Sequence, residues 1–445
     1  MPADHQHNTN GTVRGDSATV APTMVLGNLR GPLLAVGLLA GVAGLGAAAW
    51  LGWDRGDDWR HFLHSYLVNF GYFLSLSLGG LFFVLLQHVS RAGWSVTVRR
   101  LAELLAANAF LLALLFLPIL ASVLSGNHSL YEWADAEEVA HDPLLAHKAV
   151  FLNPQAFALR AAGYFVVWVF LGTYYLTKSR QQDGSRDWRA TAAMERLSPL
   201  GLLLFAATLT FASFDWLMSL VPHWYSTIFG VYYFSGAAVG ALAAVILMGM
   251  FLQAGGRLGE ETGTGPLSGR SAAPPPVQSG PVPVSSPSIT VEHYHDLGKL
   301  LFAFVVFWGY IAFSQYLLIW YANIPEETVW YRPRHAGPWG LVSLGLLAGH
   351  LLLPFFGLLS RSQKRCRLVL GFWAVWLLAM HWIDVYWLVM PRLSPDVPVF
   401  GPIDACCLVG MGGLFVAGVV LAAGRGSLVP LADPRLDEAM EFENA

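Results

Sequence analysis

Several ionisable side chains lie inside long apolar stretches of the sequence, where a charge costs free energy unless it has a partner or a function. Among them are His64, Asp215, His381 and Asp384. His381 and Asp384 are three residues apart, so on a helix they share one face, and the carboxyl group can bond the imidazole or a neighbouring helix. An imidazole beside a carboxyl group suits the uptake and release of protons. A satisfied polar pair that joins two helices is the alternative interpretation.

A second titratable group follows a proline-rich stretch and occupies residues 291–299. It contains His293, His295 and Asp296. In a helix, two histidines that are two residues apart point about 200° away from each other, which argues against a metal site here. The group suits the collection of protons at a membrane surface, or it caps a charged helix end. Glu103, near the end of another apolar stretch, would continue such a route.

Residues 126–156 combine acidic and apolar side chains in an amphipathic pattern. The acidic side chains include Glu132, Asp135 and Glu137. This pattern predicts a short helix on a membrane surface, which either contacts a partner protein or lies there without one.

Two more side chains belong to the same surface. His223 follows Pro222 in a tight turn, because the proline forces the chain to reverse. Arg160 stands three or four residues inside its apolar stretch, so its long side chain can reach water or a partner at the surface.

These side chains must be positioned by membrane-spanning helices. The sequence is 55% hydrophobic and only 12% charged, about half the charged fraction of a soluble protein. A helix needs about twenty apolar residues to cross a bilayer, and ten segments satisfy this length. The segments cover residues 32–53, 61–88, 101–124, 157–177, 198–220, 224–252, 297–322, 338–359, 368–390 and 402–423. The sequence therefore predicts an all-α integral membrane protein.

The connections between the segments predict the orientation and the organisation of the chain. One side, which includes both termini, has 19 Lys and Arg residues, and the other has 6. The positive side faces the cytoplasm, so both termini are expected there, in a bacterial inner membrane. The expected parts are a tail at 1–30, six spans at 31–254, a linker at 255–289, four spans at 290–424 and a tail at 425–445. The linker is rich in Gly, Pro and Ser, a composition that cannot form a packed core.

The number and spacing of the cysteines argue against an iron–sulfur cluster or a covalently attached haem c in this chain. The chain has only Cys366, Cys406 and Cys407, too few thiolates for an iron–sulfur cluster, and it has no C-x-x-C-H for attaching haem c. We therefore expect this chain to bind neither group itself, and any electron transfer would take place in other subunits.

Four long strings carry a resemblance to a known family. They cover residues 213–220, 222–230, 290–299 and 313–328. They resemble the F subunits of alternative complex III, which belong to the NrfD-like family, also called the polysulfide-reductase membrane subunits. The likeness covers roughly residues 30 to 425, and one departure is Val221, where many relatives have an acid.

The resemblance implies a role in a quinol:cytochrome c or quinol:oxygen oxidoreductase. In such complexes, iron–sulfur and c-haem subunits lie on the outer face, and two NrfD-like subunits anchor them. Quinol oxidation is assigned chiefly to the sister C subunit, while the F subunit is similar to a second, proton-conducting copy. The resemblance also allows a quinone- or quinol-contacting surface on this chain. The implied architecture is two four-helix bundles, spans two to five and six to nine, with spans one and ten at the periphery.

The residues and the resemblance together suggest a proton path in two halves. The inner half would use Glu103, His293, His295 and Asp296. The outer half would use His64, Asp215, His381 and Asp384. Three other classes remain open: a haem b protein with His350 and His381 as axial ligands, a secondary transporter, and a purely structural anchor.

Overall fold

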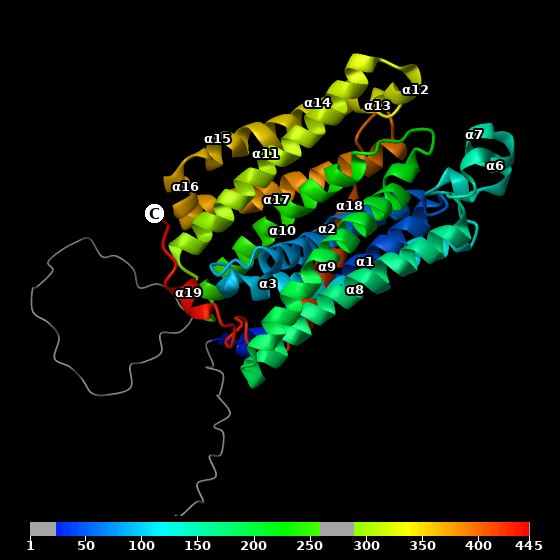
Figure 1. The fold of residues 1–445 in the computed structure, drawn as a ribbon. Helices are drawn as coiled ribbons and strands as arrows, with labels where there is room; N and C mark the ends of the chain where they lie inside the picture. The colour runs from blue at the N-terminus through cyan, green and yellow to red at the C-terminus, as the bar shows by residue number, and fades with distance from the viewer. Residues whose placement is uncertain (1–23, 259–288, 445) are drawn as a thin grey trace, which may run out of the picture.

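The computed structural model describes residues 24–258 and 289–444, and within this part of the chain it contains helices and no strands (Figure 1). Ten of these helices are long and apolar enough to cross a membrane. The prediction of an all-α integral membrane protein with ten spans is therefore confirmed.

The first and second spans are α1 (Arg30–Arg55) and α2 (Arg60–Val89). The third span is built from α3 (Val96–Ala107), α4 (Ala109–Leu115) and α5 (Leu117–Leu124). The fourth and fifth spans are α8 (Pro154–Ser185) and α9 (Trp188–Trp216). The last five spans are α10 (Phe229–Ala254), α11 (Val291–Ala322), the eighth span built from α14 (Gly337–Leu346), η5 (Leu347–Leu352) and α15 (Leu353–Leu359), α17 (Arg367–Val389) and α18 (Pro402–Ala423).

Two four-helix bundles make up the body of the protein. Spans two to five pack around one another through α2, α3, α8 and α9. Spans six to nine do the same through α10, α11, the α14–α15 span and α17, which lie along the other edge of the molecule (Figure 1). The bundles meet where α2 packs against α10 and α17, and α2 is consequently the most buried span.

Spans one and ten form a separate pair. α1 and α18 share the most extensive helix–helix contact in the structure and pack together against α2. Their backbones approach closely because glycines face each other. A Cβ atom on Gly37 would lie 2.8 Å from the carbonyl oxygen of Gly413, so a larger residue would push the helices apart. Small residues at such contacts are typical of helix association in membranes, because the hydrophobic effect does not favour helix–helix contact over contact with equally apolar lipid.

Several spans differ from the expected segments. The fourth ends at Ser185 rather than at residue 177, the fifth begins at Trp188 rather than at 198, and the seventh begins at Val291 rather than at 297.

Three more spans differ in other details. The sixth span begins at Phe229 rather than at residue 224, because residues 221–228 form an irregular turn after Pro222. The third span is interrupted at Asn108 and Phe116. The eighth span contains the π-helical turn η5, which ends at Leu352, two residues before Pro354. A π turn of this kind relaxes the backbone next to a proline and is frequent at functional sites.

Both ends of the described chain lie on the same side of the bundle, as an even number of spans requires. The backbone N–H of Leu428 donates to the carbonyl oxygen of Met24 at 2.8 Å. We call this the terminus side and the other the loop side. The predicted Gly/Pro/Ser-rich linker falls mostly on residues 259–288, which lie outside the described residues.

The expected C-terminal tail is packed against the protein. We call residues 427–444 the C-terminal strap. It contains α19 (Leu436–Met440) and runs across the terminus side. The backbone N–H of Leu431 donates to Asp183 of α8, and the Asn444 side chain donates to Glu292 of α11 at 3.0 Å. The strap therefore connects the two bundles.

Short helices cover the loop side. The acidic amphipathic stretch forms η3 (Glu132–Ala134), α6 (Ala136–His141) and α7 (Pro143–Lys148), as the sequence pattern predicted, with α6 and α7 projecting beyond the end of α8 (Figure 1). The connection after α11 contains α12 (Pro325–Thr328) and α13 (Arg332–His335).

Candidate functional site

A row of polar side chains runs along α2 from the loop side to the middle of the membrane. His61 bonds Asp404 of α18, with 3.1 Å between Nε2 and the carboxyl oxygen. Deeper in, Asn69 accepts a hydrogen bond from the Trp382 indole at 2.9 Å. Deeper still, Ser75 bonds His381. Each step links α2 to α17 or α18, so the row lies at the junction of the two bundles and of the peripheral pair.

His64 lies near the loop-side end of this row. It is 1% exposed, its Nδ1 bonds the carbonyl oxygen of Arg60 at 2.8 Å, and its Nε2 has no hydrogen-bond partner among the described residues. A buried imidazole nitrogen without a partner is uncommon, because it loses its bond to water on burial. Such an atom is well suited to exchange a proton with a water molecule.

His381 and Asp384 occupy the centre of the junction. The imidazole Nε2 of His381 lies 2.7 Å from the Ser75 hydroxyl, and its Nδ1 has no partner among the described residues. Asp384 accepts hydrogen bonds from the Tyr232 hydroxyl and from the Trp308 indole, the latter at 3.2 Å. The two residues therefore share a helix face, as predicted, but each bonds a neighbouring helix rather than the other.

Two glycines of α10 make room for this pair. A Cβ atom on Gly236 would lie 2.8 Å from Cε1 and 2.9 Å from Nδ1 of His381, and 3.6 Å from an Asp384 carboxyl oxygen. A Cβ atom on Gly240 would lie 2.9 Å from Cδ2 of His381. The imidazole therefore packs directly on the backbone of α10.

His350 completes the central cluster. The π turn η5 carries it toward α11, where its ring stacks on Trp308 with 4.0 Å between centroids. Its ring centroid lies 6.4 Å from that of His381, and neither of its ring nitrogens has a partner among the described residues. We call His350, His381, Asp384, Ser75, Tyr232 and Trp308 the central cluster.

The central cluster does not fit haem b. An axial histidine needs a free ring nitrogen that faces the iron and open space for the flat macrocycle. In His381, Nε2 faces Ser75 and Nδ1 faces the backbone at Gly236. Neither nitrogen of His381 therefore has room in front of it for the macrocycle. Among the described residues, no group of three or more His, Cys, Asp or Glu side chains could hold a metal ion.

Asp215 lies apart from the central cluster, inside the first bundle. Its carboxyl group forms two hydrogen bonds with the Arg160 guanidinium, at 2.9 and 2.7 Å, and accepts a third from the Tyr164 hydroxyl at 2.7 Å. Arg160 thus turns toward a carboxylate in the protein, and its side chain is only 20% exposed. Such two-point pairing sets a guanidinium directly against the buried carboxyl group and connects α8 to α9.

Glu103 is also charge-compensated, on the terminus side. It lies 3.4 Å from the Arg99 Nε and 3.0 Å from the Arg100 Nε, and all three side chains are buried. Arg99 also pairs with Asp433 of the C-terminal strap, and Arg100 with Asp183 of α8 at 2.9 Å. This network attaches the strap to the first bundle.

His293, His295 and Asp296 lie together at the start of α11. His293 caps the helix, because its Nδ1 accepts a hydrogen bond from the backbone N–H of Thr290 at 3.1 Å. The Nδ1 atom of His295 lies 3.9 Å from a carboxyl oxygen of Asp296, and the same oxygen lies 2.5 Å from the Nζ atom of Lys299. The structure brings these three residues together, while Glu103 occupies its own network on α3.

The acidic residues of the loop side are mostly engaged within the chain. Glu132 pairs with Arg392, and Asp135 caps α6 through the backbone N–H of Glu137 at 2.9 Å. His223 bonds Asp142 at 2.5 Å, and this hydrogen bond lowers the pKa of the Asp142 carboxyl group. Among the residues expected to face a partner, Glu137 and His223 are exposed.

A buried arginine that the sequence analysis did not single out holds the end of α17. Arg334 donates to the carbonyl oxygens of Trp330, Trp387 and Leu388, at 2.6 to 3.2 Å, and its guanidinium stacks over Trp330. Burial lowers its pKa to about 9. The sequence did not distinguish Arg334 from the other arginines of the loops. The clamp fixes the helix end that lies one turn beyond Asp384.

Ser75, Tyr232 and Trp308 were also missed, because isolated Ser, Tyr and Trp residues are common in membrane helices. The glycines at positions 236 and 240, four residues apart, were the signal that could have located the contact with His381.

Comparison with known proteins adds no family assignment: no family model matches the sequence, and no curated protein matches it.

Proposed function

We propose that this chain is a membrane subunit of a respiratory quinol oxidoreductase, and that it moves protons while partner subunits carry the electrons. The family resemblance of residues 213–230 and 290–328 supports the assignment to such a complex. The observation that carries the proton role is Asp384, a carboxyl group buried at the junction of the bundles with only neutral donors around it.

A lone buried carboxyl group is chemically distinct from a paired one. Burying an anion without a cation costs a large free energy, and gaining a proton removes that cost. Tyr232 and Trp308 donate hydrogen bonds but bring no positive charge. Asp384 can therefore take up a proton and give it back, with His381 one turn away as the next acceptor.

The row on α2 supplies the outer part of the route. His64, Asn69 and Ser75 lie in order along one buried helix and contact α17 at two points. The spaces between these groups exceed one hydrogen bond, so water molecules must complete the chain. On the terminus side, His295 and Asp296 would collect protons, and the Glu103 network would hold the strap beside them.

The partners and the location belong to the same proposal. The complex would contain a sister NrfD-like C subunit and iron–sulfur and c-haem subunits, and it would lie in a bacterial inner membrane with both termini in the cytoplasm. This chain itself would bind no redox group, and a quinone or quinol would contact at most its surface. Purification of the tagged chain should recover haem-staining partner bands; recovery of the chain alone would contradict the assignment.

The proton role is tested with Asp384→Asn and His381→Gln in the intact complex, reconstituted in sealed vesicles. We expect each to lower the number of protons moved per electron and the quinol turnover, because one relay group is lost. Asp215→Asn is the comparison variant: Asp215 was expected in the outer half of the path, but its pairing with Arg160 means that its loss should lower stability and leave the proton-to-electron ratio of the assembled complex unchanged. If both central variants kept the wild-type proton-to-electron ratio and turnover, the proton role would be wrong.

A structural anchor is the second candidate. The ion-paired Glu103 and Asp215 favour it, because both hold helices or the strap in place. The same experiment separates the two functions, since a pure anchor predicts an unchanged proton-to-electron ratio in every variant that assembles.

A further inference from the structure

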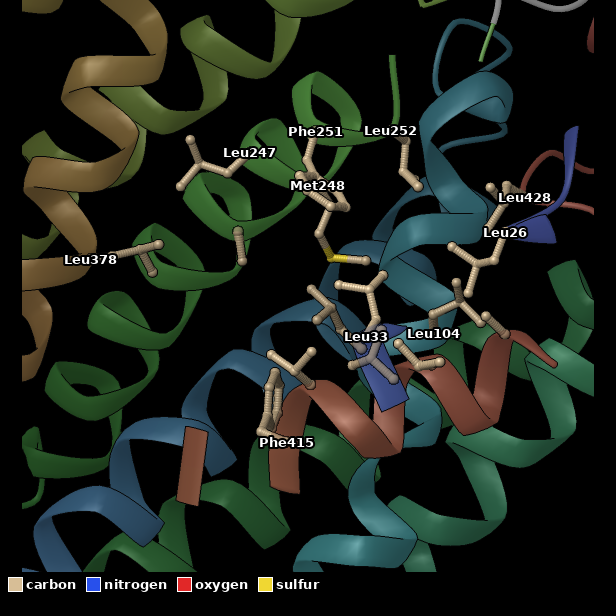
Figure 2. A pocket seen from close by; sticks show the side chains of 16 residues that line it. Leu26, Leu33, Leu104, Leu247, Met248, Phe251, Leu252, Leu378, Phe415 and Leu428 are labelled. Carbon is tan, nitrogen blue, oxygen red and sulfur yellow. The ribbon is translucent and has the colours of Figure 1, made fainter. Parts of the chain in front are cut away.

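An apolar cavity of about 390 Å³ lies on the terminus side between α1, α3, α10, α17 and α18 (Figure 2). Its wall includes Leu33, Leu104, Met248 and Phe415, and the whole lining consists of Leu, Ala, Val, Met and Phe side chains. The volume falls within the range of small-molecule sites. A cavity without polar groups at membrane depth suits a hydrocarbon chain.

A second pocket of about 500 Å³ lies at the same end of α1 and α18. It contains two arginines, Arg30 and Arg425, and no acidic residue. Arg30 has no hydrogen-bond or ion-pair partner among the described residues, and its Nε is buried. Within the described part of the chain no carboxylate compensates the charge of this partly buried guanidinium, and Arg425 beside it is exposed, so the pocket suits an anion.

The two pockets adjoin along both helices. Arg30 is four residues after Leu26 and three before Leu33, and these two leucines line the apolar cavity. Within α1, Arg30 and Leu33 are three residues apart and share one helix face, so the guanidinium lies on the side of α1 that borders the cavity, while Leu26 reaches the cavity from the segment before the helix. On α18, Ala423 lines the apolar cavity and the next residue, Gly424, lines the arginine pocket.

We propose that this corner binds one glycerophospholipid with an anionic headgroup. One acyl chain fills the apolar cavity, and the phosphate lies between Arg30 and Arg425. Guanidinium groups bind phosphate with two parallel hydrogen bonds, which gives both arginines a direct role in holding the headgroup. A free phosphate would leave the cavity empty, and a neutral hydrocarbon would leave Arg30 unpaired.

Such a lipid has a structural consequence for the peripheral pair. It would contact α1 and α18 on one side and α3 and α10 on the other, so it would join the pair to both bundles. This inference does not depend on the proposed respiratory role, since any function of the chain requires the same attachment.

The test uses the full-length chain, purified in detergent, stripped of lipid, and mixed with phosphatidylglycerol or phosphatidylethanolamine of identical acyl chains. Native mass spectrometry counts the retained lipid. We expect phosphatidylglycerol to be retained more strongly, and the Arg30→Gln/Arg425→Gln variant to bind it roughly tenfold more weakly. Arg186→Gln/Arg189→Gln is the matched control on the same side, with two exposed arginines outside both pockets, and should bind as the wild type does.

A cavity variant tests the acyl chain separately. Ala244 lines the apolar cavity, and Ala244→Leu would fill part of it, so we expect weaker retention of phosphatidylglycerol with the arginines intact. Inorganic phosphate at the same concentration should not displace the lipid. Equal retention of both lipids, wild-type binding by either variant, or displacement by inorganic phosphate would overturn the proposal.

Discussion

Asp215 in the first bundle and Asp384 in the second are both buried, and their partners differ. In the first bundle, Asp215 has a full positive partner in Arg160 and a third bond from Tyr164. In the second, Asp384 has only the neutral donors Tyr232 and Trp308. Both carboxyl groups are at most 2% exposed, so burial alone does not distinguish them.

The comparison shows that the charge of the partner decides what a buried carboxyl group can do. A carboxylate paired with arginine stays ionised and joins two helices, and removing its partner is damaging. A carboxyl group with neutral donors can exist with or without its proton. The following variants test whether the first aspartate is structural and the second is a relay.

The largest effect is expected for Arg160→Ala, which leaves Asp215 buried without a cation. The free energy of unfolding should fall by about 3 kcal/mol. Chemical unfolding of the purified chain in lipid–detergent micelles measures it. The double variant Arg160→Ala/Asp215→Ala should recover part of the loss, and a double variant as unstable as the single one would contradict the pairing argument.

A smaller loss is expected for Gly236→Ala. The added methyl group would lie 2.8 Å from the His381 ring, so the imidazole or α10 must move, at a cost of about 1 to 3 kcal/mol. Gly163→Ala in α8 is the matched control, because nothing lies within 4 Å of its Cβ position. Thermal unfolding of both variants checks the difference, and equal midpoints would show that the second bundle tolerates movement at its centre.

Asp384→Asn should cost less stability than Arg160→Ala. The asparagine keeps the shape of the side chain and loses one acceptor oxygen, which corresponds to about 1 kcal/mol. The same unfolding experiment measures it. A loss as large as that of Arg160→Ala would mean that Asp384 is held as a structural anion, like Asp215.

The smallest effect concerns the exposed pair of the loop side, Asp142 and His223. The hydrogen bond from His223 lowers the pKa of Asp142 below its ordinary value of 3.8. A lowered pKa stabilises the fold above the ordinary value, and this contribution disappears as the pH falls through the lower folded value.

Asp142→Asn should therefore open α7 more than the wild type does at about pH 6, and the difference should shrink as the pH falls through the lowered pKa of Asp142. Hydrogen exchange of the α7 backbone measures this opening. A difference that persisted in acid would assign the effect to the helix cap that Asp142 also provides to Leu144.

The spans could be predicted from sequence because a membrane helix is a local property of about twenty apolar residues. The site could be predicted only in part. His381 and Asp384 stand out in their own helix, yet Arg160 and Asp215 are 55 residues apart, and their pairing depends on how α8 packs on α9. The sequence does not show whether a charged side chain near the end of a span points toward water or toward a partner inside the protein.

The C-terminal strap could not be predicted for a similar reason. Asp433 resembles any acidic residue of a polar tail, and its partner Arg99 lies 334 positions earlier in the chain. The start of the sixth span was misplaced because Trp224 and Tyr225 read as apolar, while the turn after Pro222 takes the backbone out of the helix.

The pairing of α1 with α18 bears on how the protein is made. The glycine surface of α1 is inserted first, and its complement at Gly410 and Gly413 leaves the ribosome only with the tenth span. Until α18 is synthesised, the glycine surface of α1 must be exposed to lipid or be bound by another helix. A nascent chain that stops before α18 would leave this surface unmatched, and membrane quality control could recognise such an unfinished product.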